Sequence, residues 1–178
     1  MFARKGYAAA TVQDVADAVG ILKGSLYYYI KTKEDLLYSI LVEVHEGADA
    51  LHAAVAASDL SAFEQLLLYV RLQLEWNVQN LVKISVYYND MRQLSPNRLA
   101  DVRKRAKAHE RFIVGLIKEG QCDGHINADA DPVLLANHVL AVVIWPYRWF
   151  RPTGRLSVES LLLMCDAFVR GGLAAPSA

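Results

Sequence analysis

Residues 11–29 read TVQDVADAVGILKGSLYYY and predict two short helices joined by a tight turn. Thr11 and Asp14 have the spacing of a capping box, in which the threonine hydroxyl accepts a hydrogen bond from the third helical amide. Gly20 permits the left-handed backbone that ends the first helix, and residues 22–29 are expected to form the second helix. Apolar side chains recur at helical spacing along the first helix, at Val12, Val15, Ala16 and Val19.

The second helix carries polar and basic side chains in an arrangement that suits a DNA-reading helix. Two short helices joined by a turn form a helix-turn-helix, in which the second helix enters the major groove. Lys23 and Ser25 lie at the N-terminal end of residues 22–29, where base edges are met. The spacing of these residues alone fits an ordinary helical hairpin as well as it fits a DNA-binding helix-turn-helix. The side chains suited to phosphate contacts are Tyr27, Tyr28 and Lys33.

Residues 2–37 read FARKGYAAATVQDVADAVGILKGSLYYYIKTKEDLL and closely resemble the DNA-binding domain of TetR-family transcriptional repressors. The resemblance implies a DNA-binding domain over residues 1–40 whose partner is a double-stranded operator. It depends on Gly6-Tyr7, Thr11, Ala16, Gly20, Gly24, Leu26-Tyr27, Lys33-Glu34 and Leu36-Leu37. The candidate DNA contacts are Thr11, Lys23, Gly24, Ser25, Tyr27, Tyr28 and Lys33.

The start of the chain departs from the family. The family has a helix before the Gly6-Tyr7 pair, and only the last turn of that helix, residues 2–5, is present in this sequence. We therefore expect either a native start upstream of Met1 or a truncated form with reduced affinity for DNA. A truncated form that has lost DNA binding would be a ligand-binding or dimerisation module, which is one alternative to a repressor.

The composition excludes several classes of protein. The 178 residues include 19 Lys and Arg against 19 Asp and Glu, so the net charge is zero, and 54% are hydrophobic. These values exclude a wholly basic nucleic-acid coat and a disordered chain, but they allow a local DNA-binding patch. The chain has only two cysteines, its N-terminus lacks an apolar signal segment, and its apolar run at residues 139–146 is too short to cross a bilayer. We expect a soluble cytoplasmic protein without contact to a membrane.

Almost every remaining segment has apolar residues at helical period, which predicts an all-α protein. Pro146 should kink or end its helix, because proline lacks an amide donor. We expect Gly120 and Gly124 to end a long helix and the Gly171-Gly172 pair to end the last one. The expected helices span residues 11–18, 22–29, 33–56, 61–76, 80–91, 96–121, 132–149 and 157–170.

The last two helices carry apolar residues on more than one face, which indicates that each is covered on two sides. One side can pack on the domain and the other on a second copy. We therefore predict a homodimer through these helices, with two recognition helices on a pseudo-palindromic site. Residues 41–173 would bind the effector and dimerise, helix 33–56 would transmit the signal, and residues 174–178 would form a flexible tail.

Residues 145–157 read WPYRWFRPTGRLS and resemble the same region of TetR-family regulators of fatty-acid and steroid degradation. Those regulators respond to acyl-CoA thioesters, so the resemblance implies a small apolar effector of this kind and no other cofactor. The aromatic residues after residue 33 fit either a packed core or an apolar cavity. Basic residues on one helix face, at Lys104, Lys107 and Arg111, fit either phosphate binding or a solvated surface. The effector-binding candidates are Tyr69, Trp76, Tyr87, Met91, Arg105, Phe112, Trp145 and Arg148.

Enzyme motifs are mostly missing from the chain, since it contains no GxSxG, P-loop or GxGxxG sequence. His45, Asp49 and His52 share one helix face and are a weak candidate for a metal site. A small helical metalloenzyme is therefore a second alternative. The repressor is the reading that we favour, with no catalytic residue and no metal.

Overall fold

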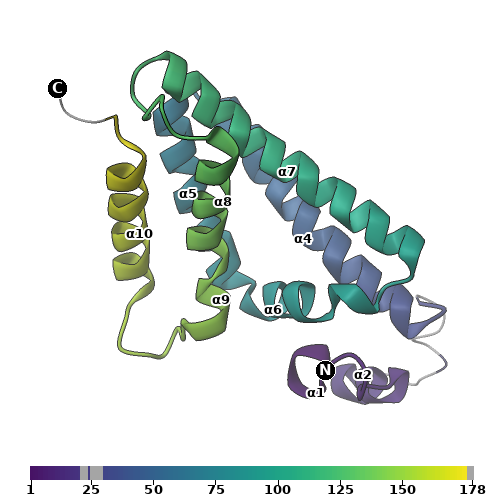
Figure 1. Ribbon diagram of the computed structural model, residues 1–178. Coiled ribbons are helices and arrows are strands. Elements are labelled where there is room, and N and C mark those ends of the chain that lie inside the picture. The colour runs from purple at the N-terminus through teal and green to yellow at the C-terminus, as the bar shows by residue number, and fades with distance from the viewer. Residues whose placement is uncertain (21–23, 25–29, 176–178) are drawn as a thin grey trace. The chain divides into compact units, whose positions relative to one another are not determined.

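The computed structural model describes residues 1–20, 24 and 30–175, which fold into helices joined by short turns (Figure 1). These residues form no β-strand, only an isolated bridge between Ile126 and Ala174, and the all-α prediction is confirmed. None of the described helices is both long and apolar enough to cross a bilayer. The helices are α1 (Phe2–Lys5), α2 (Val12–Val19), α4 (Lys33–Ala56), α5 (Ala62–Gln79), α6 (Leu81–Asp90), the 3-10 helix η1 (Met91–Gln93), α7 (Pro96–Cys122), α8 (Pro132–Ile144), α9 (Pro146–Trp149) and α10 (Val158–Leu173).

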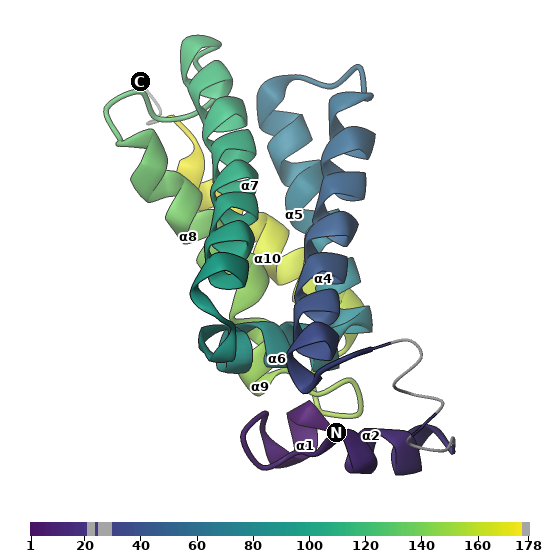
Figure 2. The same ribbon diagram turned by 90° about the vertical axis from the view of Figure 1, so that its right-hand side faces the viewer.

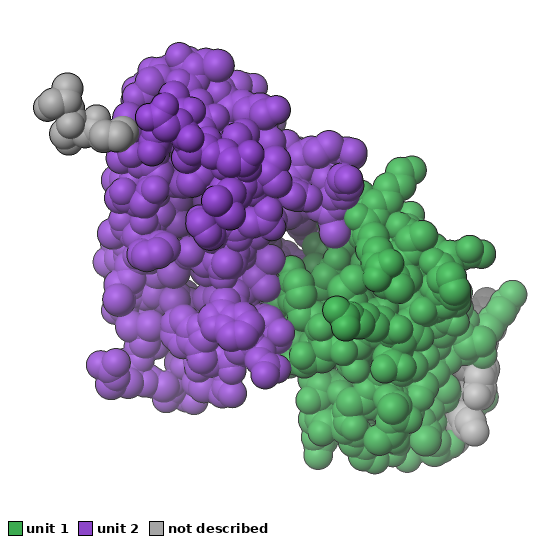
Figure 3. Space-filling view, viewed as in Figure 1, with its two compact units in different colours: residues 1–46, 82–105 green, residues 47–81, 106–178 purple. Residues whose placement is uncertain are grey.

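The chain divides into two compact units, which Figure 3 shows in different colours. Unit 1 consists of Met1–Glu46 and Val82–Arg105, and unit 2 consists of Gly47–Leu81 and Ala106–Ala178. The helices α4 and α7 are long (Figure 2), and each contributes residues to both units. Unit 1 therefore combines the N-terminal segment with residues 82–105, while the boundary of a DNA-binding domain at residue 40 stays a prediction.

The helix starts follow the local sequence. The Thr11 hydroxyl accepts from the Asp14 amide at 3.1 Å, and the Asp14 carboxylate accepts from the Thr11 amide at 2.8 Å. The same reciprocal pair forms between Ser61 and Glu64 at the start of α5. Gly20 ends α2 with φ 71°, in the left-handed region. These predictions are confirmed because each depends on residues only a few positions apart.

The break before α9 also follows the local sequence. The chain leaves the α8 helix after Ile144, and α9 begins at Pro146, as predicted for a residue without an amide donor. Gly120, in contrast, lies inside α7 and does not end it. A Cβ atom at residue 120 would lie 2.7 Å from Cδ1 of Ile126, so this glycine permits a close approach between two segments.

The end of α10 depends on a distant segment. The helix continues through both Gly171 and Gly172 to Leu173, so the predicted stop at these glycines is wrong. The Leu173 carbonyl accepts from the Asn127 amide at 3.0 Å, and the next residue forms the bridge to residue 126. These tertiary contacts stabilise the last turn against the weak helix preference of glycine.

The core of unit 1 forms around the first half of α4. Leu37 and Leu41 are fully buried there, and Val102 of α7 packs in the same cluster. Phe2 is only 4% exposed, although α1 is a single turn. A helix this short is unstable alone, so α1 depends on this packing.

The core of unit 2 forms around α5, which packs against α8 and α10. Its fully buried side chains include Leu66, Tyr69 and Leu74. Val143 of α8 is also fully buried, and Val169 of α10 is 3% exposed. Helix α5 is therefore covered on most sides, and polar groups on its buried face need partners inside the unit.

Candidate DNA-binding, effector and dimerisation sites

The predicted DNA-reading helix follows α2. Of its residues the structure describes only Gly24, which is helical and exposed. The other candidates of this helix lie outside the described residues, and their DNA contacts stay predictions: Lys23, Ser25, Tyr27 and Tyr28. Thr11 is exposed, and its hydroxyl caps α2. Hydrogen bonds from Lys5 and Thr11 lower the pKa of the Asp14 carboxyl to about 2. The Asp14 carboxylate is therefore charged near neutral pH when it caps the start of α2.

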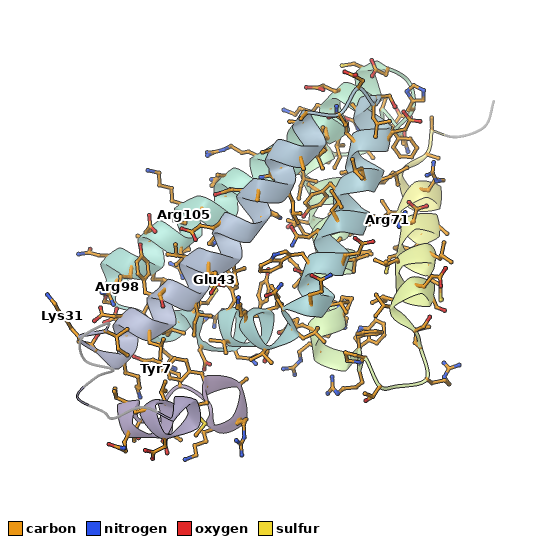
Figure 4. The ribbon with its side chains drawn as sticks, turned by 180° about the vertical axis from the view of Figure 1, so that it is seen from behind. Tyr7, Lys31, Glu43, Arg71, Arg98 and Arg105 are labelled. Atoms are coloured by element: carbon orange, nitrogen blue, oxygen red, sulfur yellow. The ribbon has the colours of Figure 1, made fainter. Side chains whose placement is uncertain are left out.

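Lys33 braces the turn between α1 and α2. Its ammonium group donates to the carbonyl oxygens of Tyr7 at 2.8 Å and Ala10 at 3.0 Å, and it lies 4.2 Å from the centre of the Tyr7 ring. Lys31, two residues earlier, is exposed (Figure 4). Sequence reasoning missed this structural role of Lys33, because its acceptors lie more than 20 residues away. A phosphate contact by Lys33 stays a prediction.

Among the hydrogen bonds between residues 82–105 and the N-terminal segment of unit 1, two join a backbone amide to a carboxylate. The Asp90 carboxylate, which is 9% exposed, accepts from the backbone amide of Tyr7 at 3.3 Å. The Glu34 carboxylate accepts from the Ser95 amide at 2.9 Å, and this bond lowers the pKa of the Glu34 carboxyl. Both carboxylates therefore hold backbone groups of another segment in place.

Arg98 of α7 adds an ionic contact to the same region. Its guanidinium binds the Asp35 carboxylate and lies 3.7 Å from Glu34. The bond from Arg98 and the bond from Thr32 lower the pKa of the Asp35 carboxyl to about 2. Figure 4 shows Arg98 on α7, close to the start of α4. Unit 1 thus joins the start of α4 to the start of α7 through charged groups.

Three of the effector candidates lie in unit 1. Tyr87 is 4% exposed, its hydroxyl lies 3.0 Å from Nε2 of His45, and burial raises its pKa to about 12. Met91 packs against the unit 1 core. Arg105 donates to Asp101 one turn earlier on α7 at 3.0 Å. The structure therefore places these three side chains in structural contacts of unit 1.

Three other effector candidates lie in unit 2, and two of them meet. The Tyr69 hydroxyl lies 2.8 Å from Nε2 of His109, and Phe112 stacks on His52 with ring centres 4.1 Å apart. Tyr69 and Phe112 thus belong to one cluster of four rings from α4, α5 and α7. The histidines of this cluster were not among the predicted effector contacts.

Trp76 lies further along α5 and packs on α4. A Cβ atom at Gly47 would lie 2.5 Å from Cζ2 of the Trp76 ring, so the indole occupies the space that any larger residue would need. Sequence reasoning treated Trp76 as a member of the effector set and did not identify Gly47. A glycine inside a helix is the signal that points to such a close contact.

The last two effector candidates lie near an apolar groove of unit 2. The groove has a volume of about 680 Å³ and is lined mainly by α8, α9 and α10, with Trp145, Cys165 and Phe168 among its residues. Trp145 is 59% exposed at its edge. Arg148 is exposed and lies 5.9 Å from the Tyr147 ring. The helices around the groove also expose Leu134, Trp149, Leu163 and Met164.

The weak metal candidate is not assembled. His45 contacts Tyr87 in unit 1, whereas His52 stacks in unit 2 and its Nδ1 lies 4.0 Å from Asp49. Within the described ranges, no three His, Cys, Asp or Glu side chains come together as metal ligands. The helical spacing of these residues therefore does not bring them to one centre.

Two family models match the chain. The model described as "Bacterial regulatory proteins, tetR family" matches residues 1–40, and the model described as "Tetracyclin repressor-like, C-terminal domain" matches residues 59–173. Together they cover most of the sequence.

Three known proteins resemble the chain over nearly its whole length. The HTH-type transcriptional repressor KstR2 of Rhodococcus jostii RHA1 is 30% identical over 99% of this chain and 87% of its own. The ketosteroid transcriptional regulator KstR2 of Mycobacterium tuberculosis has a solved structure with TM-score 0.91 and 26% identity, over 99% of this chain and 90% of that chain. AibR, solved with isovaleryl coenzyme A and operator DNA, has TM-score 0.84 over 99% and 93%, and at 24% identity it shows the shared fold. The matched families and relatives regulate transcription, so the metalloenzyme alternative is wrong.

Proposed function

The chain belongs to the TetR family of bacterial transcriptional regulators, and from this premise we propose that it is a homodimeric repressor that a small apolar effector releases from its operator. The observation that carries the proposal is the capped helix α2, which ends in the left-handed Gly20 immediately before the predicted recognition helix. The operator is pseudo-palindromic in this proposal because a twofold dimer presents two recognition helices. Such a repressor acts in the cytoplasm, where operator DNA lies.

The exposed apolar face of unit 2 supports a dimer through α8 and α10. Leu163 and Met164 are each 65% exposed and Phe168 is 68% exposed. Large apolar side chains gathered on one face are typical of an interface between proteins. A second copy seated on this face covers the groove as well. Trp145 and Arg148 then lie at the dimer contact. If either residue binds the effector, the effector contacts both copies of the chain.

The ring cluster of Tyr69, Phe112, His52 and His109 supports an effector site inside unit 2. Aromatic side chains with a few polar groups are typical of sites for small apolar molecules. An acyl-CoA effector is supported by AibR, whose structure contains isovaleryl coenzyme A, and by the resemblance of residues 145–157. Exposed cations on α7 are available for its phosphates: Lys104, Lys107 and Arg111.

Helix α4 is the element proposed to transmit the signal, since it contributes to both units. The effector must bind the DNA-released form better than the DNA-bound form, because equal affinity for both forms shifts no population. A hundredfold preference corresponds to about 2.7 kcal/mol of coupling. The effector would thus change the spacing of the two recognition helices without touching DNA.

Fluorescence anisotropy tests the repressor. The probe is the DNA upstream of the protein's own gene, titrated with the 178-residue chain and with a chain extended upstream, with and without long-chain acyl-CoA. We expect salt-sensitive binding that acyl-CoA abolishes. Binding that ignores acyl-CoA would contradict the effector class alone. Absence of binding by both chains would favour the alternative of a ligand-binding and dimerisation module.

Light scattering tests the dimer interface. Phe168→Asp should halve the molar mass of the particle in solution, because it buries a charge in the apolar contact. Val82→Asp is the matched control, since Val82 is 66% exposed on α6 and lies outside the proposed interface. An unchanged mass for the Phe168 variant would contradict this interface.

A further inference from the structure

A relay of buried amides runs from α5 to the end of α8 in unit 2. Nδ2 of Asn77 donates to the Val143 carbonyl at 2.7 Å, and Nε2 of Gln73 donates to Oδ1 of Asn77 at 2.9 Å. A carbonyl oxygen can only accept, so Asn77 must present its NH₂ group to Val143. Its oxygen then faces Gln73, which must present its own NH₂ group. The relay therefore defines the orientation of both amides.

This orientation leaves the Gln73 oxygen without a donor. The residue is 6% exposed, and no hydrogen-bond donor from any described part of the chain reaches Oε1. Buried amide oxygens in proteins nearly always have a partner. Either a buried water or a donor of a bound molecule can complete the hydrogen bonding of such an acceptor.

A second unpaired atom lies on α4. Nδ1 of His52 lies 4.0 Å from the Asp49 carboxylate, too far for a hydrogen bond, but the negative charge favours the tautomer with its proton on Nδ1, in which Nε2 is an acceptor. Burial lowers the pKa of His52, which favours the neutral ring. Among the groups that the structure describes, none donates to Nε2. The ring itself is held by stacking on Phe112.

The helix register places the two acceptors in one region of unit 2. Gly47 of α4 lies against Trp76 of α5, and His52 lies against Tyr69, so the two helices run antiparallel. Gln73 comes one turn after Tyr69 on the same face of α5 and thus lies between these two contacts. Both acceptors therefore belong to the region between α4 and α5 that borders the ring cluster.

We propose that the effector carries a hydrogen-bond donor, most simply a hydroxyl group on its apolar part, that Gln73 Oε1 accepts and that His52 Nε2 supplements as a second acceptor. This inference rests on the proposed function, in which the effector enters unit 2. Carboxylates, ketones, ethers and thioester carbonyls present only acceptors and would leave both protein atoms unpaired. The pantetheine arm of coenzyme A also has donors, so an acyl-CoA needs a hydroxyl group on its chain where the acyl part is the part that reaches Gln73.

Two isomeric probes separate a donor from an acceptor without knowledge of the natural effector. Octan-1-ol and heptyl methyl ether have the same atoms, but only the alcohol can donate. Calorimetric titration of the full chain should show that the alcohol binds about tenfold more tightly than the ether. Equal affinities would overturn the proposal and would mean that buried water satisfies the acceptors.

Substitutions at Gln73 and His52 test whether their side-chain atoms cause the preference for the alcohol. Gln73→Met keeps the length of the side chain and removes the acceptor, so the alcohol and the ether should bind equally. Gln79→Met, at the exposed end of α5, is the matched control and should keep the tenfold preference. If the Gln73 variant does not fold, His52→Phe keeps the ring stack and should reduce the preference. A full preference in either folded variant would contradict the assignment.

Measuring the release of operator DNA separates the hydroxyl preference from the proposed repressor function. With the operator probe, a 3-hydroxyacyl-CoA should release DNA at lower concentration than the saturated acyl-CoA of equal length. Failure of both to release DNA would count against the acyl-CoA repressor, while the alcohol and ether pair would still decide the donor site. Equal release by both would agree with the repressor and contradict the hydroxyl preference.

Discussion

Unit 1 and unit 2 hold their helices together by different kinds of contact, although α4 and α7 contribute to both. In unit 1 the contacts that join the start of α4 to the start of α7 are ionic and partly exposed, as in the pair of Arg98 with Asp35, whose side chains are 32% and 26% exposed. In unit 2 the contact that joins α5 to α8 is neutral and buried, namely the bond from Asn77 to the Val143 carbonyl. The same long helices thus meet two different environments.

The two kinds of contact should respond differently to solution conditions and to mutation. Partly exposed ion pairs contribute little free energy, and salt and pH change them. Buried amides contribute little net energy when satisfied, but they are costly to break, because the remaining partner stays buried and unpaired. We therefore expect the larger stability effects in unit 2 and the effects of solution conditions in unit 1.

The largest effect is expected for Asn77→Ala in unit 2. The change removes both bonds of the relay and leaves the Val143 carbonyl and the Gln73 amide buried without partners. The free energy of unfolding should fall by about 3 kcal/mol, measured by urea denaturation. Asn137→Ala is the matched control, because Asn137 is exposed and bonds only within α8, and its loss should stay within about 0.5 kcal/mol. Equal losses would show that the buried relay adds no more stability than an exposed bond within one helix.

A smaller effect is expected for Lys33→Met in unit 1. The variant loses the donor that holds the turn between α1 and α2, so the free energy of unfolding should fall by about 2 kcal/mol. Lys31→Met removes an exposed charge and should change it by less than about 0.5 kcal/mol. An unchanged stability for the Lys33 variant would contradict the role of its ammonium group in holding this turn. Titrations of both variants with operator DNA at several salt concentrations complete the comparison.

The smallest effect concerns the pH dependence of unit 1. The pKa of Asp35 is lowered from 3.8 to about 2, so its charged form stabilises the fold above pH 3.8, and this contribution is lost as the pH falls toward 2. Arg98→Gln removes the main cause and should flatten the loss of stability over this interval in thermal unfolding. Arg71→Gln, which breaks an i,i+4 pair in unit 2, should leave the acid profile as in the parent. An unaltered profile in the Arg98 variant would refute this role of the pair.

Much of the fold follows from short sequence patterns. The helix at residues 33–56 has the predicted bounds, and the capping pairs at Thr11 and Ser61 form as expected. Pro146 breaks its helix as predicted. The predicted stop at Gly171-Gly172 failed because bonds from a distant segment stabilise the helix there. Local patterns therefore predict elements well until a tertiary contact outweighs the propensity of one residue.

The candidate site follows from sequence only in part. The aromatic residues chosen as one effector set divide between two units, since Tyr87 lies in unit 1 and Tyr69 in unit 2. Helical spacing shows which residues share a face, but it does not show which helix covers that face. His109 and Gln73 carried no signal in the sequence, because their importance comes from burial and hydrogen-bond partners 4 to 40 residues away.

The sequence by itself determined the helix starts, the turn at Gly20 and the resemblance to a family of repressors, because each depends on neighbouring residues. Only the tertiary structure decided that residues 82–105 pack with the N-terminal segment, that Lys33 braces a turn, and that one oxygen of Gln73 lacks a donor. The physical reason is the distance along the chain between the interacting residues. Caps and turns are satisfied within one turn of chain, whereas burial and hydrogen-bond satisfaction are set by whichever segments fold against each residue.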